Sequence, residues 1–290
     1  MKSKAIIILG IVIVVAIAAF CIISNSGDSA DSTNANVESI QTSVPTSKQP
    51  LNISIYLDLS DRIKPDGTNE LSQQDKDIAI VEYLANYVKQ RAVKMKILPC
   101  KDRIKVFFYP QPSDAKIALL SDQLELDLKA TDLKDKKRRL TSFTDEFKNS
   151  LEQIYSSTIE TGNWIGSDIW GFFNKPINNY CIKSGYRNIL VVLTDGYIDY
   201  VPNKLSSGSA HNFISSTTLK DSKSTLIPGK AELNSLEVLM LELNPKPITD
   251  QPKMEQVISD WLKEMGVQKY YVGETDVITN TKMIIQNFIK

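Results

Sequence analysis

The 290-residue chain has little of what most catalytic and metal sites need, since it contains one histidine, His211, and three cysteines. With a single histidine, we expect neither Ser-His-Asp or Cys-His catalysis nor a histidine-rich zinc site. Three cysteines are too few for a disulfide scaffold. Pairing of Cys100 with Cys181 stays open, because a sequence does not show whether their Cα atoms are close enough.

The chain also lacks an excess of either charge, because 34 lysine and arginine residues balance 34 aspartate and glutamate residues. A nucleic-acid-binding domain usually carries a basic excess, so we expect no nucleic-acid partner. Hydrophobic residues make up 42% of the chain. That share is enough for a folded core and excludes a wholly disordered or collagen-like protein.

Residues 5–23 form a run of 19 residues without a charged side chain. As a helix, this run would span about 28 Å, close to the thickness of the hydrocarbon core of a bilayer. Lys2 and Lys4 precede it, which keeps the N-terminus in the cytoplasm by the positive-inside rule. We therefore expect residues 1–23 to be a transmembrane signal anchor, with the remainder facing the periplasm or the cell exterior.

Two alternatives to an anchor stay open, a cleaved signal peptide and a bacterial lipoprotein. Residues 16–21 partly match a lipoprotein box, but Phe20 stands where that motif has a small residue, which favours the anchor. Residues 24–50 are rich in Ser, Thr and Asn and contain no aromatic residue. Such a segment cannot bury enough apolar area to offset its ordering entropy. We expect it to be a disordered tether and residues 51–290 to be the folded domain.

Apolar runs of strand length alternate with helical patterns through residues 51–290. Strands are expected at 52–58, 103–109, 188–194, 236–243 and 270–272, with an antiparallel edge strand near 124–128. Between the strands, apolar residues recur at helical spacing. One such helix is expected to begin at Ser72, a second at Ser142, where Asp145 three residues later completes a capping box, and a third near Asp168. This order predicts a three-layer α/β/α fold with a mostly parallel, Rossmann-like sheet.

In such a sheet, ligands bind outside the carboxyl ends of the strands, where the strand order reverses. Three polar segments are expected at that edge: Asp58, Ser60, Asp61 and Arg62 after the first strand, Ser167 and Asp168 before a helix, and Thr194, Asp195 and Gly196 after the central strand. Carboxylates and hydroxyls without histidine or cysteine suit a hard cation such as Mg²⁺, Ca²⁺ or Mn²⁺. A glycine after Asp195 allows the chain to turn sharply.

Taken in order, Asp58-x-Ser60-x-Arg62, Gly166-Ser167 and Thr194-Asp195-Gly196 resemble the von Willebrand factor type A (vWA) domain and its metal-ion-dependent adhesion site. The resemblance covers about residues 51–290. It implies that Asp58, Ser60, Ser167 and Asp195 hold a divalent cation, Mg²⁺ first, and that an acidic residue of a partner protein fills the free coordination position. Asp61, Arg62, Asp168 and Gly196 would lie at the edge of this site.

Arg62 departs from the family pattern, because it stands where a second serine ligand is expected. It removes one hydroxyl and places a permanent positive charge near the cation, so the site is degenerate. Asp61 or Asp168 could restore the charge balance. Alternatively, Arg62 could replace the cation and pair with Asp195 or directly with an acidic partner.

A basic cluster lies outside these motifs, at Lys134, Lys136, Lys137, Arg138 and Arg139. It can be a solvated helix face or loop, or it can contact lipid headgroups or an acidic partner.

The leading interpretation is a membrane-tethered extracytoplasmic vWA-like module that binds a protein at the carboxyl edge of its sheet, with or without a divalent cation. A structural subunit of an envelope assembly with a decayed metal site is the first alternative. A metal-dependent phosphoesterase, in which the same carboxylates hold a metal and a water nucleophile, is the second. We expect no enzymatic activity, because neither a general base nor a phosphate-cradling Gly-rich loop accompanies the carboxylates.

Overall fold

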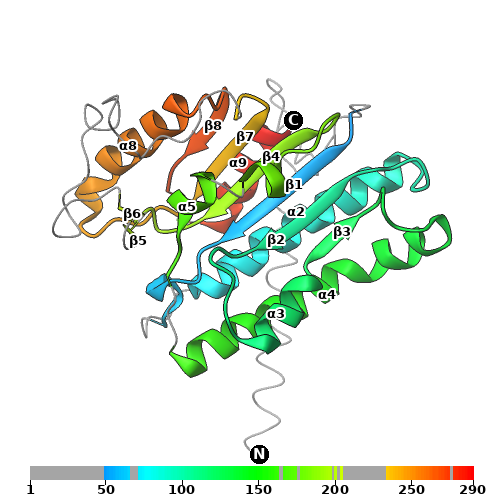
Figure 1. Cartoon of the computed structure of the whole chain (residues 1–290), viewed down its shortest axis with the longest axis horizontal. Coiled ribbons are helices and arrows are strands. Elements are labelled where there is room, and N and C mark those ends of the chain that lie inside the picture. The colour runs from blue at the N-terminus through cyan, green and yellow to red at the C-terminus, as the bar shows by residue number, and fades with distance from the viewer. Residues whose placement is uncertain are drawn as a thin grey trace, which may run out of the picture. The chain divides into compact units, whose positions relative to one another are not determined.

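The computed structural model describes residues 49–65, 71–162, 166–174, 177–197, 199–200, 203–204, 233–274 and 277–290 (Figure 1). The predicted anchor, almost all of the predicted tether, and His211 lie outside the described residues. Within the described part, none of the helices combines the length and the apolar character that crossing a membrane requires.

A mixed sheet of six strands forms the centre of the domain, in the order β3-β2-β1-β4-β7-β8. The strands are β1 (Leu51–Leu57), β2 (Arg103–Phe107), β3 (Glu125–Asp127), β4 (Arg187–Leu193), β7 (Leu236–Leu241) and β8 (Lys269–Val272). Every neighbouring pair is parallel except β2 and β3. The expected antiparallel edge strand is therefore confirmed. Two short strands, β5 (Asp199–Tyr200) and β6 (Asn203–Lys204), pair separately.

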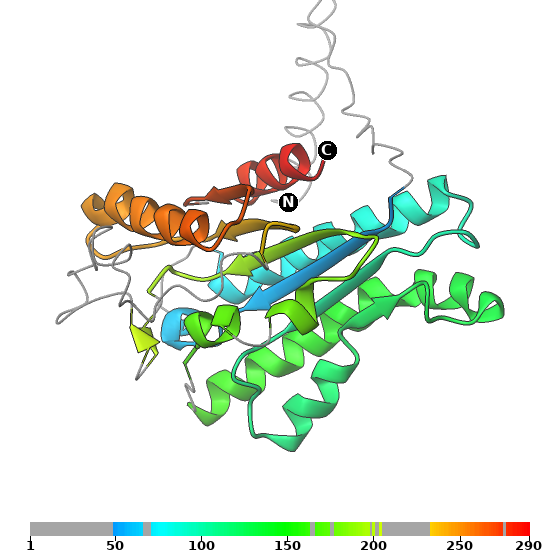
Figure 2. The same cartoon turned by 45° about the horizontal axis from the view of Figure 1, so that its top comes forward.

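Helices cover both faces of this sheet (Figure 2). They are α2 (Gln73–Lys94), α3 (Ala115–Asp122), α4 (Leu133–Thr161), α5 (Ile169–Asn174), α6 (Ile177–Cys181), α8 (Gln251–Glu264) and α9 (Ile278–Ile289), with 3-10 turns η1 (Asp61–Ile63) and η3 (Ile248–Asp250). Buried side chains of α2, α3, α4 and α9 join one hydrophobic cluster, and those of α5, α6 and α8 join another. The predicted three-layer α/β/α fold with a mostly parallel sheet is confirmed.

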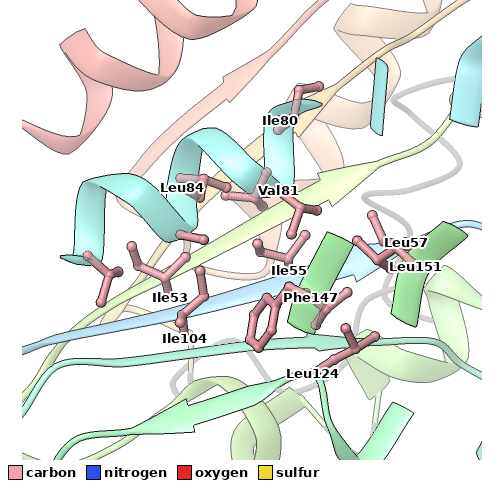
Figure 3. Packing of buried hydrophobic residues seen from close by; sticks show 14 of the residues in the cluster. Ile53, Ile55, Leu57, Ile80, Val81, Leu84, Ile104, Leu124, Phe147 and Leu151 are labelled. Carbon is pink, nitrogen blue, oxygen red and sulfur yellow. The ribbon is translucent and has the colours of Figure 1, made fainter. Parts of the chain in front are cut away.

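Strand β1 shows why the sheet has two cores. All seven of its residues are buried, as is typical of a central parallel strand covered on both faces. Ile53, Ile55 and Leu57 point to the cluster that α2 and α4 complete, where Figure 3 shows them beside Val81 of α2 and Phe147 of α4. Tyr56, on the opposite face, belongs to the second cluster.

Two local predictions at helix starts have opposite outcomes. Ser72 caps α2, since its hydroxyl accepts the backbone N–H of Asp75 at 3.2 Å. The start expected at Ser142 is wrong, because α4 begins at Leu133 and Ser142 lies within it. The reason is that the Lys- and Arg-rich segment before Ser142 is itself a good helix former.

The two described cysteines are free thiols, Cys100 in one hydrophobic cluster and Cys181 in the other. The sheet lies between these clusters, so the pairing left open by the sequence does not occur. Burial raises the pKa of Cys100 to about 11 and that of Cys181 to about 12.

The strand order places the switch point between β1 and β4. The chain leaves β1 for β2 on one side and leaves β4 for β7 on the other. Leu57 and Leu193, the last residues of β1 and β4, are paired in register. The residues that follow them, Asp58 and Thr194, are therefore neighbours at the edge where this fold class binds ligands.

Candidate functional site

Asp58 is held rigidly at the switch point. Its backbone N–H donates to the Leu193 carbonyl at 3.1 Å, which extends the pairing of β1 with β4 by one residue. Its Oδ1 accepts the backbone N–H of Ser60 at 2.8 Å, and its Oδ2 accepts the hydroxyl of Thr194 at 2.8 Å. Only 1% of Asp58 is exposed. The carboxylate is thus fixed by donors from both strand ends.

Asp195 brings a second, half-buried carboxylate to this edge. Its Oδ1 accepts the backbone N–H of Tyr197 at 3.1 Å, and its carbonyl accepts the backbone N–H of Asn244 at 3.0 Å. Burial, followed by the nearby Asp58 carboxylate, raises the pKa of Asp195 to about 7, although Arg62 acts in the opposite direction. The Asp58 carboxylate therefore lies close enough to Asp195 to raise its pKa.

Gly196 provides the turn after Asp195. Its φ is +92°, a conformation that non-glycine residues adopt with strain, and its N–H donates to the Thr194 hydroxyl at 3.2 Å. A Cβ at this position would lie 2.4 Å from Sδ of Met254 and 2.8 Å from Cδ2 of Leu243. The site therefore requires glycine both for conformation and for space.

Arg62 takes a partner that the sequence did not predict. Its Nη2 lies 2.5 Å from Oδ2 of Asp77 on α2, and its Nε donates to the Asp58 carbonyl at 3.0 Å. Only 4% of the Arg62 side chain is exposed, so most of the guanidinium is enclosed by the protein. Of the alternatives left open for Arg62, pairing with Asp195 is therefore corrected, because the guanidinium pairs with Asp77 instead. Asp77 is buried on the first turns of α2, and a buried carboxylate needs a partner.

A hydrogen-bonded network extends from Asp77 to Glu242, the residue that follows β7. The Tyr155 hydroxyl donates to Oδ2 of Asp77 at 2.6 Å. Gln73 Nε2 donates to Oδ1 of Asp77 at 3.1 Å and to Oε2 of Glu242 at 3.0 Å. Burial raises the pKa of Asp77, while Arg62 and these donors oppose the shift. The network thus links α2, α4 and the end of β7.

Glu242 directly follows β7 and was not predicted as a site residue. It is 5% exposed and has φ +72°, a strained conformation for a non-glycine residue that tends to occur at functional sites. The available signal in the sequence was a charged residue at the end of an apolar strand run. Asp77, beside the apolar stripe of α2, offered a similar signal.

Ser167 and Asp168 lie on the segment before α5. The Tyr56 hydroxyl donates to the Tyr109 carbonyl at 2.7 Å and also lies 2.7 Å from the Ser167 hydroxyl, which consequently donates to it. Oδ1 of Asp168 accepts the backbone N–H of Gly171 at 2.8 Å, so Asp168 caps α5. Burial first, and the Asp58 and Asp168 carboxylates to a smaller extent, raise the pKa of Tyr56. The segment therefore lies close to the end of β1.

A cleft of about 280 Å³ opens at this edge of the sheet. It is lined by Asp61, Arg62, Gln73, Asp195, Tyr197, Glu242, Asn244 and Lys246. The volume is slightly below the usual range of small-molecule sites, about 300–1,000 Å³. Asp61, Arg62 and Asp195, from the predicted site and its edge, face the cleft, whereas Asp58 lies buried behind them.

The polar side chains at this edge of the sheet offer oxygen donors. They include the Asp58 carboxylate with the Thr194 hydroxyl bonded to it, and the nearby Asp195 carboxylate. Mg²⁺ is usually held by one or two such carboxylates together with retained water. The guanidinium of Arg62 already supplies one positive charge beside both carboxylates. Among the described residues, no three or more histidine, cysteine or acidic side chains form a group that could hold a metal. Any ion here would therefore depend on hydroxyls and water as well as on the two carboxylates.

No protein-family model and no curated protein matches this chain. One similar solved structure is the crystal structure of conserved hypothetical protein BatB from Bacteroides thetaiotaomicron, with 15% identity and a TM-score of 0.42, covering 82% of this chain and 97% of that chain. Another is an aerotolerance-related membrane protein from Bacteroides fragilis NCTC 9343, with 16% identity and a TM-score of 0.38, covering 82% and 98%. Likeness at this level assigns no function to the present chain.

Proposed function

We propose that this chain is a membrane-tethered, extracytoplasmic vWA-like module that binds a protein partner at the carboxyl edge of its sheet. The observation that carries the proposal is the juxtaposition of Asp58 and Asp195 at the switch point between β1 and β4, next to an open cleft. Two carboxylates that repel each other, one buried and one half-buried, cost stability, and a binding role gives a reason for keeping them together.

A divalent cation, Mg²⁺ first, is part of this proposal. Asp58, Ser60, Ser167 and Asp195 would hold it, with Thr194 keeping the Asp58 carboxylate in place. Ser167 would exchange its hydrogen bond to Tyr56 for the ion. The bound ion would offer its free coordination position to an acidic side chain of the partner. In this account the ion pair of Arg62 with Asp77 supports the first loop.

The tether and its orientation belong to the same proposal. The charge-free run at residues 5–23, preceded by lysines, would anchor the chain, and the domain would face the periplasm or the cell exterior. A partner on the same side of the membrane would then meet the cleft.

The Arg62–Asp77 pair favours a second candidate function, that of a structural subunit of an envelope assembly without a working metal site. A guanidinium in the first loop, with its charge satisfied by Asp77, can replace the charge of a cation. In that case the carboxylates would serve to order the loops.

A cation-dependent capture experiment separates these candidates. Four full-length proteins are immobilised in detergent, with either Mg²⁺ or EDTA in the buffer: the wild type, Asp58→Asn, Asp195→Asn and the control Asp122→Asn. Asp122 is a matched control because its carboxylate is exposed at the end of α3. The proposal expects one set of proteins to bind the wild type and the control in Mg²⁺, and to be lost with EDTA and in both site variants. Identical retention by all four proteins in both buffers would overturn it.

A further inference from the structure

The end of the domain opposite the cleft carries a strongly basic surface. Two segments form it, residues 93–101, which run from the end of α2 toward β2, and residues 129–138, which run from the loop after β3 into the start of α4. Figure 1 shows both at the same end of the domain. Its exposed basic residues are Lys94, Lys96, Lys101, Lys129, Lys134, Lys137 and Arg138. We call these two segments the basic surface.

Lys136 joins the two segments into one surface. It is 4% exposed, and its Nζ donates to the carbonyls of Leu98 at 2.8 Å and Cys100 at 2.9 Å. The N–H of Leu128 also donates to the Asp102 carbonyl at 3.0 Å. Lys136 therefore has a structural role within the cluster of basic residues that the sequence showed, and its neighbours are presented on a fixed framework.

The basic surface combines charge with exposed apolar side chains. Its two segments contain eight basic residues and two acidic ones, Asp132 and Asp135, a net charge of +6 in a chain whose total charge is zero. Three apolar side chains lie among these charged residues and are largely exposed: Val93 (57%), Leu98 (56%) and Leu133 (66%). Basic residues surrounding exposed aliphatic side chains are the composition that favours an anionic lipid surface.

The chain enters the domain beside this surface. The Arg91 guanidinium donates to the Gln49 carbonyl at 2.6 Å, and the N–H of Leu51 donates to Oδ1 of Asp102 at 2.9 Å. Residues 24–48 separate Gln49 from the predicted span. A coil of that length has a root-mean-square extension of about 25–30 Å. The predicted anchor would thus hold the basic surface near the bilayer at a high effective concentration.

We propose that the basic surface binds the headgroups of anionic phospholipids, with Leu98 and Leu133 entering the interface. The domain then lies on the membrane with the amino ends of its parallel strands toward the lipid. The cleft at their carboxyl ends faces away from the membrane, where a partner protein can reach it. This inference uses the proposed tether, but its test does not depend on a partner or on a cation.

The test places a fluorescent reporter on the basic surface of the full-length chain in lipid vesicles. Cys21→Ser leaves Cys100 and Cys181 as the remaining native thiols, and both are buried, so that a polarity-sensitive dye attaches at Leu98→Cys. Leu71→Cys, 52% exposed near the start of α2, is the matched control at the opposite edge. Vesicles contain phosphatidylcholine with or without phosphatidylglycerol. We expect a blue shift and quenching by brominated lipid for Leu98→Cys only, in the anionic vesicles only, and loss of both at high salt.

Charge reversal tests the same contact independently. The combined substitutions Lys96→Glu, Lys101→Glu and Lys134→Glu should abolish the lipid-dependent shift. The combined control Lys64→Glu, Lys116→Glu and Lys253→Glu, at exposed positions near the cleft edge, should retain it. Thermal unfolding checks that both variants fold. The proposal is overturned if the dye at position 98 reports the same environment in neutral and anionic vesicles. It is also overturned if the dye responds to soluble polyglutamate but not to lipid, which would assign the surface to an acidic protein.

Discussion

The Arg62 guanidinium lies 2.5 Å from the carboxylate of Asp77, and both side chains are buried, at 4% and 0% exposure. The pair connects the loop after β1 to α2, and the same guanidinium donates through Nε to the Asp58 carbonyl. Burial acts to lower the pKa of Arg62, but Asp77 first and Asp58 next raise it beyond its ordinary value. Arg62 is therefore charged at every accessible pH and acts as a fixed counter-ion for this end of the sheet.

Removing one member of this pair should destabilise the domain strongly. Arg62→Met leaves Asp77 buried without its counter-ion, and we expect the free energy of unfolding to fall by about 3–5 kcal/mol. The double variant Arg62→Met with Asp77→Asn should lose much less than the sum of the single losses, because asparagine still accepts the bond from Tyr155. Urea unfolding of the four proteins measures this coupling. Additive losses would show that the ion pair has no energetic role.

The raised pKa of Asp195 predicts that stability depends on pH. Its ordinary value of 3.8 becomes about 7 in the folded state, so the folded protein binds this proton more tightly than the unfolded protein does. The contribution of Asp195 to the free energy of unfolding is therefore greatest at low pH. It falls as pH rises from about 4 to about 7, by up to about 4 kcal/mol in total. Asp195→Asn should be more stable than the wild type at pH 8 and less dependent on pH. Urea unfolding in EDTA at pH 5 and pH 8 checks both points, and equal pH dependence in the two proteins would contradict the assignment.

Thr194 should contribute to stability through the hydrogen bond that its hydroxyl donates to Asp58. Thr194→Val keeps the shape of the side chain but removes the donor to a buried carboxylate, and we expect a loss of about 1–3 kcal/mol. Thr281→Val is a suitable control, since Thr281 is equally buried but its hydroxyl donates to a helix carbonyl, that of Val277, at 3.4 Å. Thermal and urea unfolding should show the larger loss for Thr194→Val. A smaller loss than in the control would mean that Asp58 does not depend on this hydroxyl.

Gly196 offers a test of the turn that carries Asp195. Gly196→Ala meets both an unfavourable φ and the side chains of Met254 and Leu243. Gly185→Ala has a similar φ, +81°, but nothing within 4 Å of the added Cβ. The difference between the two variants therefore isolates the clash, and we expect Gly196→Ala to be the less stable by about 1–3 kcal/mol. Equal melting temperatures would show that the turn adapts to the extra methyl group.

Much of the fold follows from local patterns in the sequence. The continuous apolar run of β4 and the alternation near residues 124–128 predicted a central and an edge strand, and both are confirmed. Ser72 caps α2 because an N-cap depends only on neighbouring residues. The same local reasoning failed at Ser142, where a capping pattern lies inside a longer helix.

The candidate site was predictable only in part. Asp58, Asp195 and Gly196 follow strand ends, so the topology brings them together once the sheet is parallel. The partners Asp77, Tyr155 and Glu242 come from separate elements, and Tyr155 is 78 positions from the carboxylate that it binds. No periodicity along the chain records such a contact. Arg62 could be recognised as a departure from the motif, but its partner could not be identified without the packing of α2.

A cation titration tests the central claim most directly. Calorimetry follows the titration of four full-length proteins with Mg²⁺, Ca²⁺ and Mn²⁺, and their melting temperatures are measured in parallel. The four are the wild type, Asp58→Asn, Asp195→Asn and the control Asp122→Asn. The account predicts saturable binding that raises the melting temperature of the wild type and of Asp122→Asn, and no binding by the two site variants. An absence of saturable binding by the wild type, or binding that survives in both site variants, would contradict it.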